Sequence, residues 1–383
     1  ALPIYYLDEK DVEDIANQFE ERNFPFDVIW LDIEHTISKK YFTWDPNNFK
    51  NSKEMVEKLT AHGHKLVTIV DPHVKKETGY RIYDELLKLG YFVKNKDGNV
   101  FEGWCWPGTS SYPDFTNPEV RSWWADQFAY DKYEGTTPDV YTWNDMNEPS
   151  VFDGPEVTML RDCVNGKGQE HREWHNIYGF YYHSTCVEGQ RRREPTRRPF
   201  VLTRSFFVGS QRNGPMWTGD IFSNWDHLAA TLPMLLSLGE AGISFTGSDV
   251  PGFFKDPTEE LAVRWYQFGA WMPLLRAHAH IDTKRREPWT FSTDGYNRMR
   301  TAVVERYMNL PYIYTAFWQT HKTGEPLVRS LMFMFPEDVN TYSIDTAFMF
   351  GDAMLIIPVV TEGATSVSAY IPQGEWYDVH TAS

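Results

Sequence analysis

The sequence predicts an α/β protein, a (β/α)8 TIM barrel followed by the start of a C-terminal β domain. Its 383 residues are enough for a barrel of roughly 250 residues with insertions. Short apolar runs alternate with helix-like segments along the chain. These runs are continuously apolar, which is typical of parallel strands covered on both faces. We expect the barrel over residues 1–340 and the beginning of a truncated β-sandwich over residues 341–383.

The first elements follow this alternation closely. "ALPIYYL" is a short apolar run, and Val12, Ile15, Ala16 and Phe19 then recur at helical spacing behind Asp8, a suitable N-cap. "FDVIWLD" predicts a buried strand. The segment 51–63 predicts a helix that ends at a glycine, and "KLVTIVD" predicts the next strand.

The later strands are predicted from short runs rich in β-branched and aromatic residues. These runs are "PDVYTWND", "RPFVLTR", "GPMWTGD" and "GISFTGSD", with "EPLVRSL" at 325–331 as the candidate eighth strand. "WMPLLRA", at 271–277, resembles a helical segment instead. After about residue 340 the chain has short β-rich runs and turn residues, without helical periodicity.

Composition argues against several classes of function. The net charge of −16 disfavours nucleic acid as a partner, because phosphate binding needs a basic surface. No apolar stretch approaches the ~20 residues that cross a bilayer. The three cysteines are an odd number without metal-type spacing, so neither a disulfide framework nor a metal or other cofactor is expected.

A charged residue ends six of the predicted strands. Since parallel strands of a barrel all open on one face, we expect these side chains to surround one pocket. They are Asp32, Asp71, Asp145, Arg204, Asp220 and Asp249.

Such an acidic ring has three interpretations. It could hold a divalent metal together with His73, His278 and His280, but "HAH" follows a helix-like segment rather than a strand. It could bind a polyol or sugar without chemistry. It could also hydrolyse a glycosidic bond, for which one ionised and one protonated carboxyl group are needed. Hydrolysis is favoured, because aromatic residues make up 16% of the chain and their flat faces suit a pyranose.

The ordered motifs "WLDIEHT", "DPH", "WNDMNEPSVF", "RPFVLTRSFF", "WTGD", "GFF" and "RAHAH" resemble the catalytic barrel of glycoside hydrolase family 31. The resemblance covers the chain from about residue 8 to its end. It implies a retaining exo-α-glucosidase in which Asp145 is the nucleophile and Asp220 the acid/base. Glu148, which lies just beyond Asp145, is expected to form a structural hydrogen bond to its loop.

The resemblance also implies the substrate-binding residues. Asp32 would bind hydroxyls of the terminal sugar, Arg204 would lie beside the acid/base, and His278 would bind another hydroxyl. The remaining expected members of the site are Trp106, Trp143, Met146, Trp217, Asp249 and Phe253.

The same resemblance implies a substrate, a partner and a compartment. The substrate would be α-1,3-linked glucose of N-glycans, the partner a lectin-like β subunit, and the compartment the lumen of the endoplasmic reticulum. The alternative is a catalytically incomplete barrel that binds glycans or is an inert scaffold. It is kept because the first strand, Ile221 and Pro251 depart from the family pattern.

Overall fold

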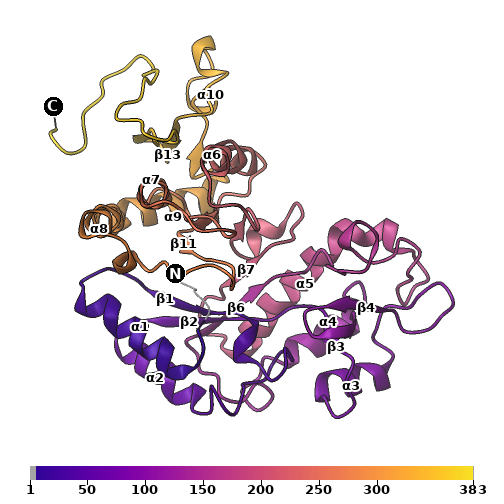
Figure 1. Cartoon of the computed structure of the whole chain (residues 1–383). Helices are drawn as coiled ribbons and strands as arrows, with labels where there is room; N and C mark the ends of the chain where they lie inside the picture. Colours follow the sequence, from indigo (N-terminus) through magenta and orange to yellow (C-terminus); the bar gives the residue numbers. More distant parts are fainter. Residues whose placement is uncertain (1–5, 383) are drawn as a thin grey trace.

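The computed structural model describes residues 6–382 and has a parallel sheet at its centre (Figure 1). Its six strands follow the spatial order β1-β2-β6-β7-β8-β9, and all neighbours are parallel. The register aligns Thr68 with Thr142 and Thr142 with Val201, so the strand ends are level. The six strands are β1 (Val28–Leu31), β2 (Lys65–Ile69), β6 (Val140–Asn144), β7 (Val201–Thr203), β8 (Met216–Trp217) and β9 (Thr246–Gly247).

A second parallel pair continues the barrel beyond β9. β10 (Asp249–Val250) pairs with β11 (Arg276–Ala277). β11 lies in the segment expected to be helical, and it supplies the parallel strand predicted at 325–331. That prediction was wrong, because β12 (Val328–Arg329) pairs antiparallel with β13 (Phe348–Phe350) and belongs to a different sheet. Periodicity did not predict β11, because this strand is only two residues long and one of them is a charged arginine, Arg276.

The predicted first helix is confirmed. α1 (Glu9–Glu21) is capped by Asp8, whose side chain accepts a hydrogen bond from the backbone N–H of Asp11. Its buried face consists of the four residues predicted from helical spacing. The predicted strand that precedes it falls largely on residues 1–5, outside the described residues.

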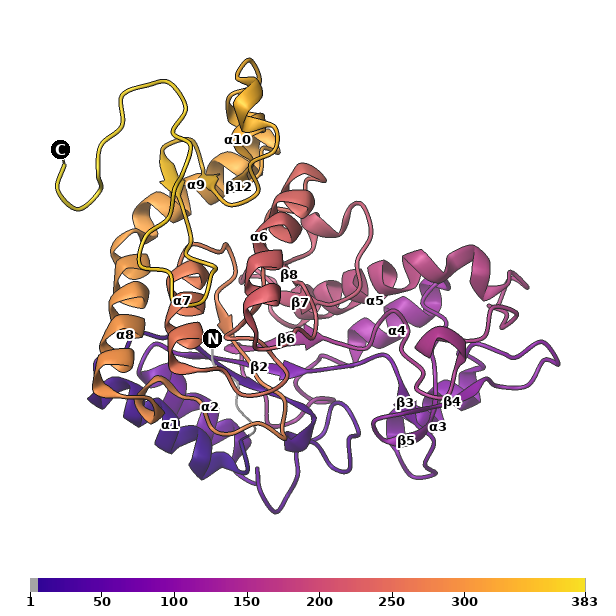
Figure 2. The same cartoon turned by 45° about the horizontal axis from the view of Figure 1, so that its top comes forward.

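The other helices cover the sheet or extend from it (Figure 2). α9 begins with a proline in its first turn and ends at Gly324, which has a positive φ of 82°. Among residues 6–382 no helix is long and apolar enough to cross a membrane. The helices are α2 (Ser52–Ala61), α3 (Arg81–Leu89), α4 (Pro118–Asp126), α5 (His171–Arg193), α6 (Trp225–Glu240), α7 (Glu259–Gly269), α8 (Thr293–Met308), α9 (Leu310–Thr323) and α10 (Leu331–Met334).

Two smaller sheets flank the barrel. The excursion between β2 and β6 contains an antiparallel sheet of order β3-β5-β4, formed by β3 (Val74–Lys75), β4 (Glu102–Cys105) and β5 (Gly108–Ser111). Near the end of the chain, β12, β13 and β14 (Met354–Ile356) form the other sheet. The boundary at residue 340 stays a prediction, and the pairing of β12 with β13 favours a boundary before β12.

The core follows this arrangement. One buried cluster packs α1, α2 and α6 to α8 against the strands, including Phe19, Leu66 and Trp265. A second cluster joins the sheet to the excursion and α5, including Trp124 and Tyr182. The central sheet therefore lies between the helices of the first cluster and the segment between β2 and β6.

Closure of the barrel leaves no space at Gly247. A β-carbon there would lie 2.0 Å from the backbone oxygen of Leu274, which precedes β11. We expect Gly247→Ala to lower the free energy of unfolding by about 3 kcal/mol, because backbone rather than a flexible side chain must move. Urea denaturation measures this. Gly166→Ala is the matched control, since its nearest atom would be a side-chain oxygen at 3.4 Å. Equal losses in the two variants would contradict the steric argument.

Candidate active site

The charged residues at the strand ends meet on one face of the sheet. The backbone N–H of Asp145, after β6, donates to Oδ1 of Asp71, after β2, over 2.9 Å. Nη1 of Arg204, after β7, lies 2.8 Å from Oδ1 of Asp145 and 3.7 Å from Oδ2 of Asp220, after β8. Asp32, after β1, is close enough for the charge of Asp145 to raise its pKa.

Arg204 is the central cation of this group. Its Nε and Nη2 donate to the two carboxylate oxygens of Glu148 over 2.8 and 3.1 Å, a bidentate pair. Nη2 also approaches the sulfur of Met146 at 3.0 Å. The expectation that Glu148 hydrogen-bonds its own loop was therefore wrong, because the carboxylate reaches across to β7 and orients the guanidinium group.

The two carboxyl groups beside Arg204 differ in exposure. The side chain of Asp145 is 13% exposed and that of Asp220 is 36% exposed. Burial raises the pKa of Asp145 to about 6, with Arg204 opposing the shift and Asp220 adding to it. Burial also raises the pKa of Asp220, again against the effect of Arg204. Burial therefore favours the protonated form of both carboxyl groups, and Arg204 favours the ionised form of both.

Asp71 is a buried residue that holds the backbone of Asp145 in place. Its Oδ2 accepts from the hydroxyl of Tyr41 over 2.6 Å, and that hydroxyl lies 2.8 Å from Nε2 of His73. Burial raises the pKa of Asp71 well above its usual range, and the charge of Asp145 adds to the shift. Asp71 therefore anchors the backbone of Asp145 instead of facing a ligand.

The arrangement gives no support to a metal centre. Within residues 6–382 no group of three or more His, Cys, Asp or Glu side chains is placed to hold a metal ion. His278 packs against Trp143 and Phe253, with ring centroids 5.2 and 5.1 Å away. His280 lies further along the loop, 3.6 Å from Asp282.

Arg276 on β11 forms a second buried ion pair that the sequence argument missed. Its Nη2 and Nε lie 2.7 and 3.1 Å from Oδ1 of Asp249, and both residues are buried. Its guanidinium carbon lies 4.8 to 5.1 Å from the ring centroids of Trp30, Trp143 and Trp217. Such distances are those of cation–π contacts. The sequence did contain a signal for this ion pair. Arg276 lies in an apolar run, which indicates burial, and a buried guanidinium group needs a carboxylate partner.

The predicted aromatic residues occupy two different environments. Trp143 and Trp217 are buried at 1% and 2% exposure and pack on Arg276. Trp106 instead lies at the turn between β4 and β5 and is 41% exposed. Arg204 and Trp217 also line a cavity of about 510 Å³ between β8 and α6, next to the strand end that carries Asp220.

We expect Arg276→Met to lower the free energy of unfolding by about 3–5 kcal/mol, because Asp249 would stay buried without its cation. Adding Asp249→Asn removes that uncompensated charge and should recover much of the loss. Urea denaturation of the two variants and the unchanged chain tests this. A double variant no more stable than Arg276→Met alone would show that the loss comes from packing rather than charge.

The pH dependence of stability reports on Asp32. Burial, the charge of Glu34 and other nearby charges raise its pKa to about 8. Between its ordinary pKa and about pH 8, the folded state keeps a proton that the unfolded state loses, so stability falls as pH rises. Asp32→Asn removes this effect while keeping an oxygen for the N–H of Ile33.

The advantage of Asp32→Asn in free energy of unfolding should therefore grow from about pH 5 to about pH 8. Urea denaturation at a series of pH values measures it. Glu57→Gln, an exposed change on α2, is the control and should show no such trend. A constant difference between Asp32→Asn and the unchanged chain would contradict the raised pKa.

Comparison with known proteins agrees with this fold. Residues 3–316 match the glycosyl hydrolases family 31 TIM-barrel domain, and residues 324–383 match the glycosyl hydrolase family 31 C-terminal domain. Neutral alpha-glucosidase AB of Homo sapiens is 53% identical over 379 residues, or 98% of this chain and 40% of the relative. A probable glucan 1,3-alpha-glucosidase of Arabidopsis thaliana is 52% identical over 376 residues, 98% of this chain and 41% of the relative.

A solved structure has the same architecture. The glucosidase II alpha subunit in its Glc1Man2-bound form superposes with a TM-score of 0.97 at 46% identity, covering 99% of this chain and 41% of that chain. The chain thus spans about two fifths of the length of the relatives that it matches. With both family domains matched and more than half of its residues identical to those of a family relative, the chain belongs to glycoside hydrolase family 31.

Proposed function

We propose that this chain is the catalytic region of a retaining exo-α-glucosidase, with Asp145 as nucleophile and Asp220 as acid/base. The observation that carries the proposal is that one nitrogen, Nη1 of Arg204, contacts both carboxyl groups at 2.8 and 3.7 Å. The two oxygens can be no further apart than the sum of these distances. Such closeness favours the retaining separation of ~5–5.5 Å over most of the inverting range of ~6.5–9.5 Å.

The proposed reaction has two displacements. Asp145 attacks the anomeric carbon as the bond to the leaving oxygen breaks, and Asp220 gives its proton to that oxygen. Water then attacks the glycosyl-aspartate, returns a proton to Asp220 and frees Asp145. Product glucose keeps the α configuration, because each displacement inverts the anomeric centre.

The electrostatic environment is compatible with these roles. A nucleophile must be ionised, and Asp145, whose pKa burial raises to about 6 against the effect of Arg204, is ionised above that pH. An acid must hold its proton, and burial raises the pKa of Asp220, also against the effect of Arg204. The acids of the ring would also stabilise the positive charge of an oxocarbenium-like transition state.

Recognition of the terminal sugar is proposed for the residues around this pair. Asp32, with its raised pKa, could donate as well as accept a hydrogen bond to a hydroxyl group. His278 is held between Trp143 and Phe253 and would bind another hydroxyl. The other proposed contacts are Trp106, Met146, Arg204, Trp217 and Asp249.

We also propose a natural substrate, a partner and a compartment, by likeness to the relatives. One relative's name specifies a glucan 1,3-alpha-glucosidase, and one solved complex joins the catalytic subunit of ER glucosidase II to the binding domain of a regulatory subunit. By likeness to them, α-1,3-linked glucose of N-glycans is the proposed substrate. A lectin-like β subunit is the proposed partner, and the endoplasmic-reticulum lumen is the proposed compartment.

A mechanism-based inactivator tests the nucleophile. 5-Fluoro-α-glucosyl fluoride should label Asp145, as read by mass spectrometry of peptides, because fluorine slows breakdown of the glycosyl-enzyme. Asp145→Asn should abolish both labelling and glucose release from an aryl α-glucoside. Asp220→Asn should still be labelled, since fluoride needs no proton to leave.

Two results would contradict the proposal. Labelling at Glu148 would overturn the assignment of the nucleophile. Saturable binding of glucose-terminated oligosaccharides without any labelling or turnover would instead favour a glycan-binding scaffold.

A further inference from the structure

We propose that the outer face of the β4–β5 hairpin, centred on Trp104, is a second carbohydrate-binding surface. It would hold an inner sugar of an oligosaccharide whose terminal glucose occupies the acidic pocket. This inference rests on the proposed function and adds to it, because it assigns a determinant of oligosaccharide preference outside the pocket.

Trp104 is exposed in a way that its strand makes unavoidable. Along β4, Glu102 and Trp104 are exposed, whereas Gly103 and Cys105 are buried, the alternation expected of a strand with one free face. The inward face has no room for a larger residue, since a β-carbon on Gly103 would lie 2.5 Å from Val151. The indole of Trp104 is therefore directed outwards and remains 53% exposed.

The backbone beneath this indole is held on both edges. Trp104 pairs with Thr109 of β5 on one side. On the other side, its N–H donates to Oδ1 of Asp153 over 2.7 Å, and its carbonyl accepts from the N–H of Phe152 over 2.8 Å. The ring lies over Gly108, whose missing β-carbon would be 3.6 Å from it. A platform fixed in this way loses little entropy when it binds a ligand.

The hairpin turn connects this platform to the loop after β6, the loop that begins with Asp145. Trp106 lies at this turn and makes an edge-to-face contact with Phe152, 4.9 Å between centroids. Burial raises the pKa of Cys105, which lies between the two indoles in the sequence, and the charges of Asp71 and Asp145 add to the rise. Trp104 precedes Trp106 by two residues, a step of about 6.6 Å in extended chain.

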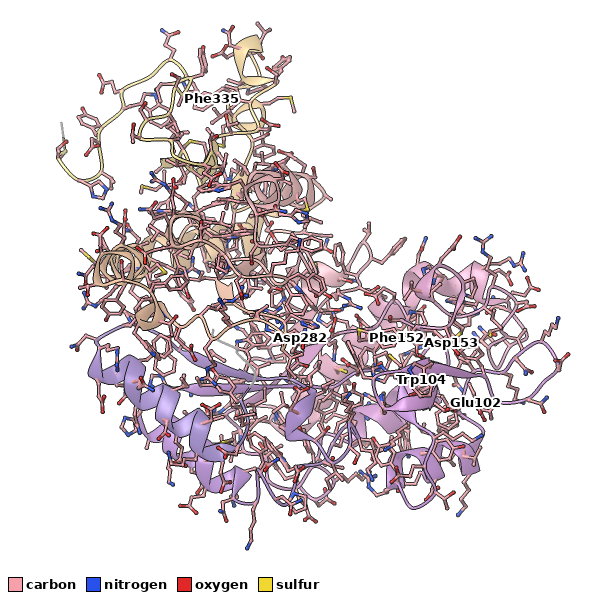
Figure 3. The ribbon with its side chains drawn as sticks, viewed as in Figure 1. Glu102, Trp104, Phe152, Asp153, Asp282 and Phe335 are labelled. Carbon is pink, nitrogen blue, oxygen red and sulfur yellow. The ribbon has the colours of Figure 1, made fainter. Side chains whose placement is uncertain are left out.

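The chemistry of the surface suits a neutral sugar. An indole face packs against the apolar face of a pyranose, and carboxylate oxygens beside it can accept from hydroxyl groups. Glu102 stands on the same face, paired with Lys76 at 2.7 Å, and Asp153 stands at its edge. Figure 3 shows Glu102, Trp104, Phe152 and Asp153 gathered on this lobe. The acidic groups disfavour a polyanion, and the edge of β5 away from β4 is already paired with β3.

Kinetic measurements with two substrates distinguish a contribution of this surface from a contribution of the acidic site. Wild type and Trp104→Ala are compared on an aryl α-glucoside, which has one sugar ring, and on a trisaccharide of glucose α-1,3-linked to mannobiose. We expect kcat/KM on the trisaccharide to fall by about tenfold, the scale of one lost aromatic contact, with the aryl glucoside unchanged within about twofold. Trp104→Phe should recover part of the loss.

The matched control is Trp318→Ala, which removes an equally exposed indole, 57% against 53%, from α9 far along the chain. It should alter neither substrate. Equal losses on both substrates in Trp104→Ala, or no loss on either, would overturn the inference.

Failure of the proposed function would appear separately, as absent turnover of the aryl glucoside by wild type. In that case, saturation-transfer NMR of the trisaccharide with wild type and Trp104→Ala decides the matter. Transfer to the mannose protons that disappears in the variant supports the surface, and transfer that persists overturns it.

Discussion

The acidic site depends on the sharing of one guanidinium group among three carboxylates. Arg204 contacts Glu148 through two nitrogens and both Asp145 and Asp220 through a third. Without a cation, so many acids at adjoining strand ends would repel one another and take up protons. The order β6-β7-β8 in the sheet places Arg204 between the strands that carry the two proposed catalytic acids. Topology therefore sets both the distance between these acids and their protonation.

A second cation performs a related task deeper in the barrel. Arg276 neutralises Asp249 and lies among three tryptophan rings contributed by β1, β6 and β8. Ion pairing and cation–π contacts together offset the cost of removing the guanidinium group from water. Trp143, packed on Arg276, also contacts His278, with ring centroids 5.2 Å apart. Contacts of this kind can position the side chains of a site.

The excursion between β2 and β6 gives the site its outer wall. It places one indole, Trp106, at the turn between β4 and β5 and another, Trp104, on the outer face of β4. The loop after β6 joins it through Phe152 and Asp153, so the segment that carries Asp145 is also tied to the hairpin. Contacts with the terminal sugar and with the next sugars would then depend on one connected element.

The sequence by itself determined much of this molecule. Continuous apolar runs predicted the parallel strands, helical spacing predicted the buried face of α1, and the charged residue after each run predicted which side chains meet. These properties are local, because the burial of a segment and the end of a strand depend mainly on residues that are neighbours in the sequence. Motif resemblance added which acids would act.

Only the tertiary structure decided the contacts between distant segments. The final parallel strand is Arg276–Ala277 rather than residues 325–331, Glu148 binds Arg204 56 positions away, and Trp104 stays exposed although most tryptophans are packed. Periodicity reports whether a side chain is buried, but it does not report what lies against it. Pairing and exposure are set when the whole chain closes, since each depends on where residues far apart in sequence come to lie.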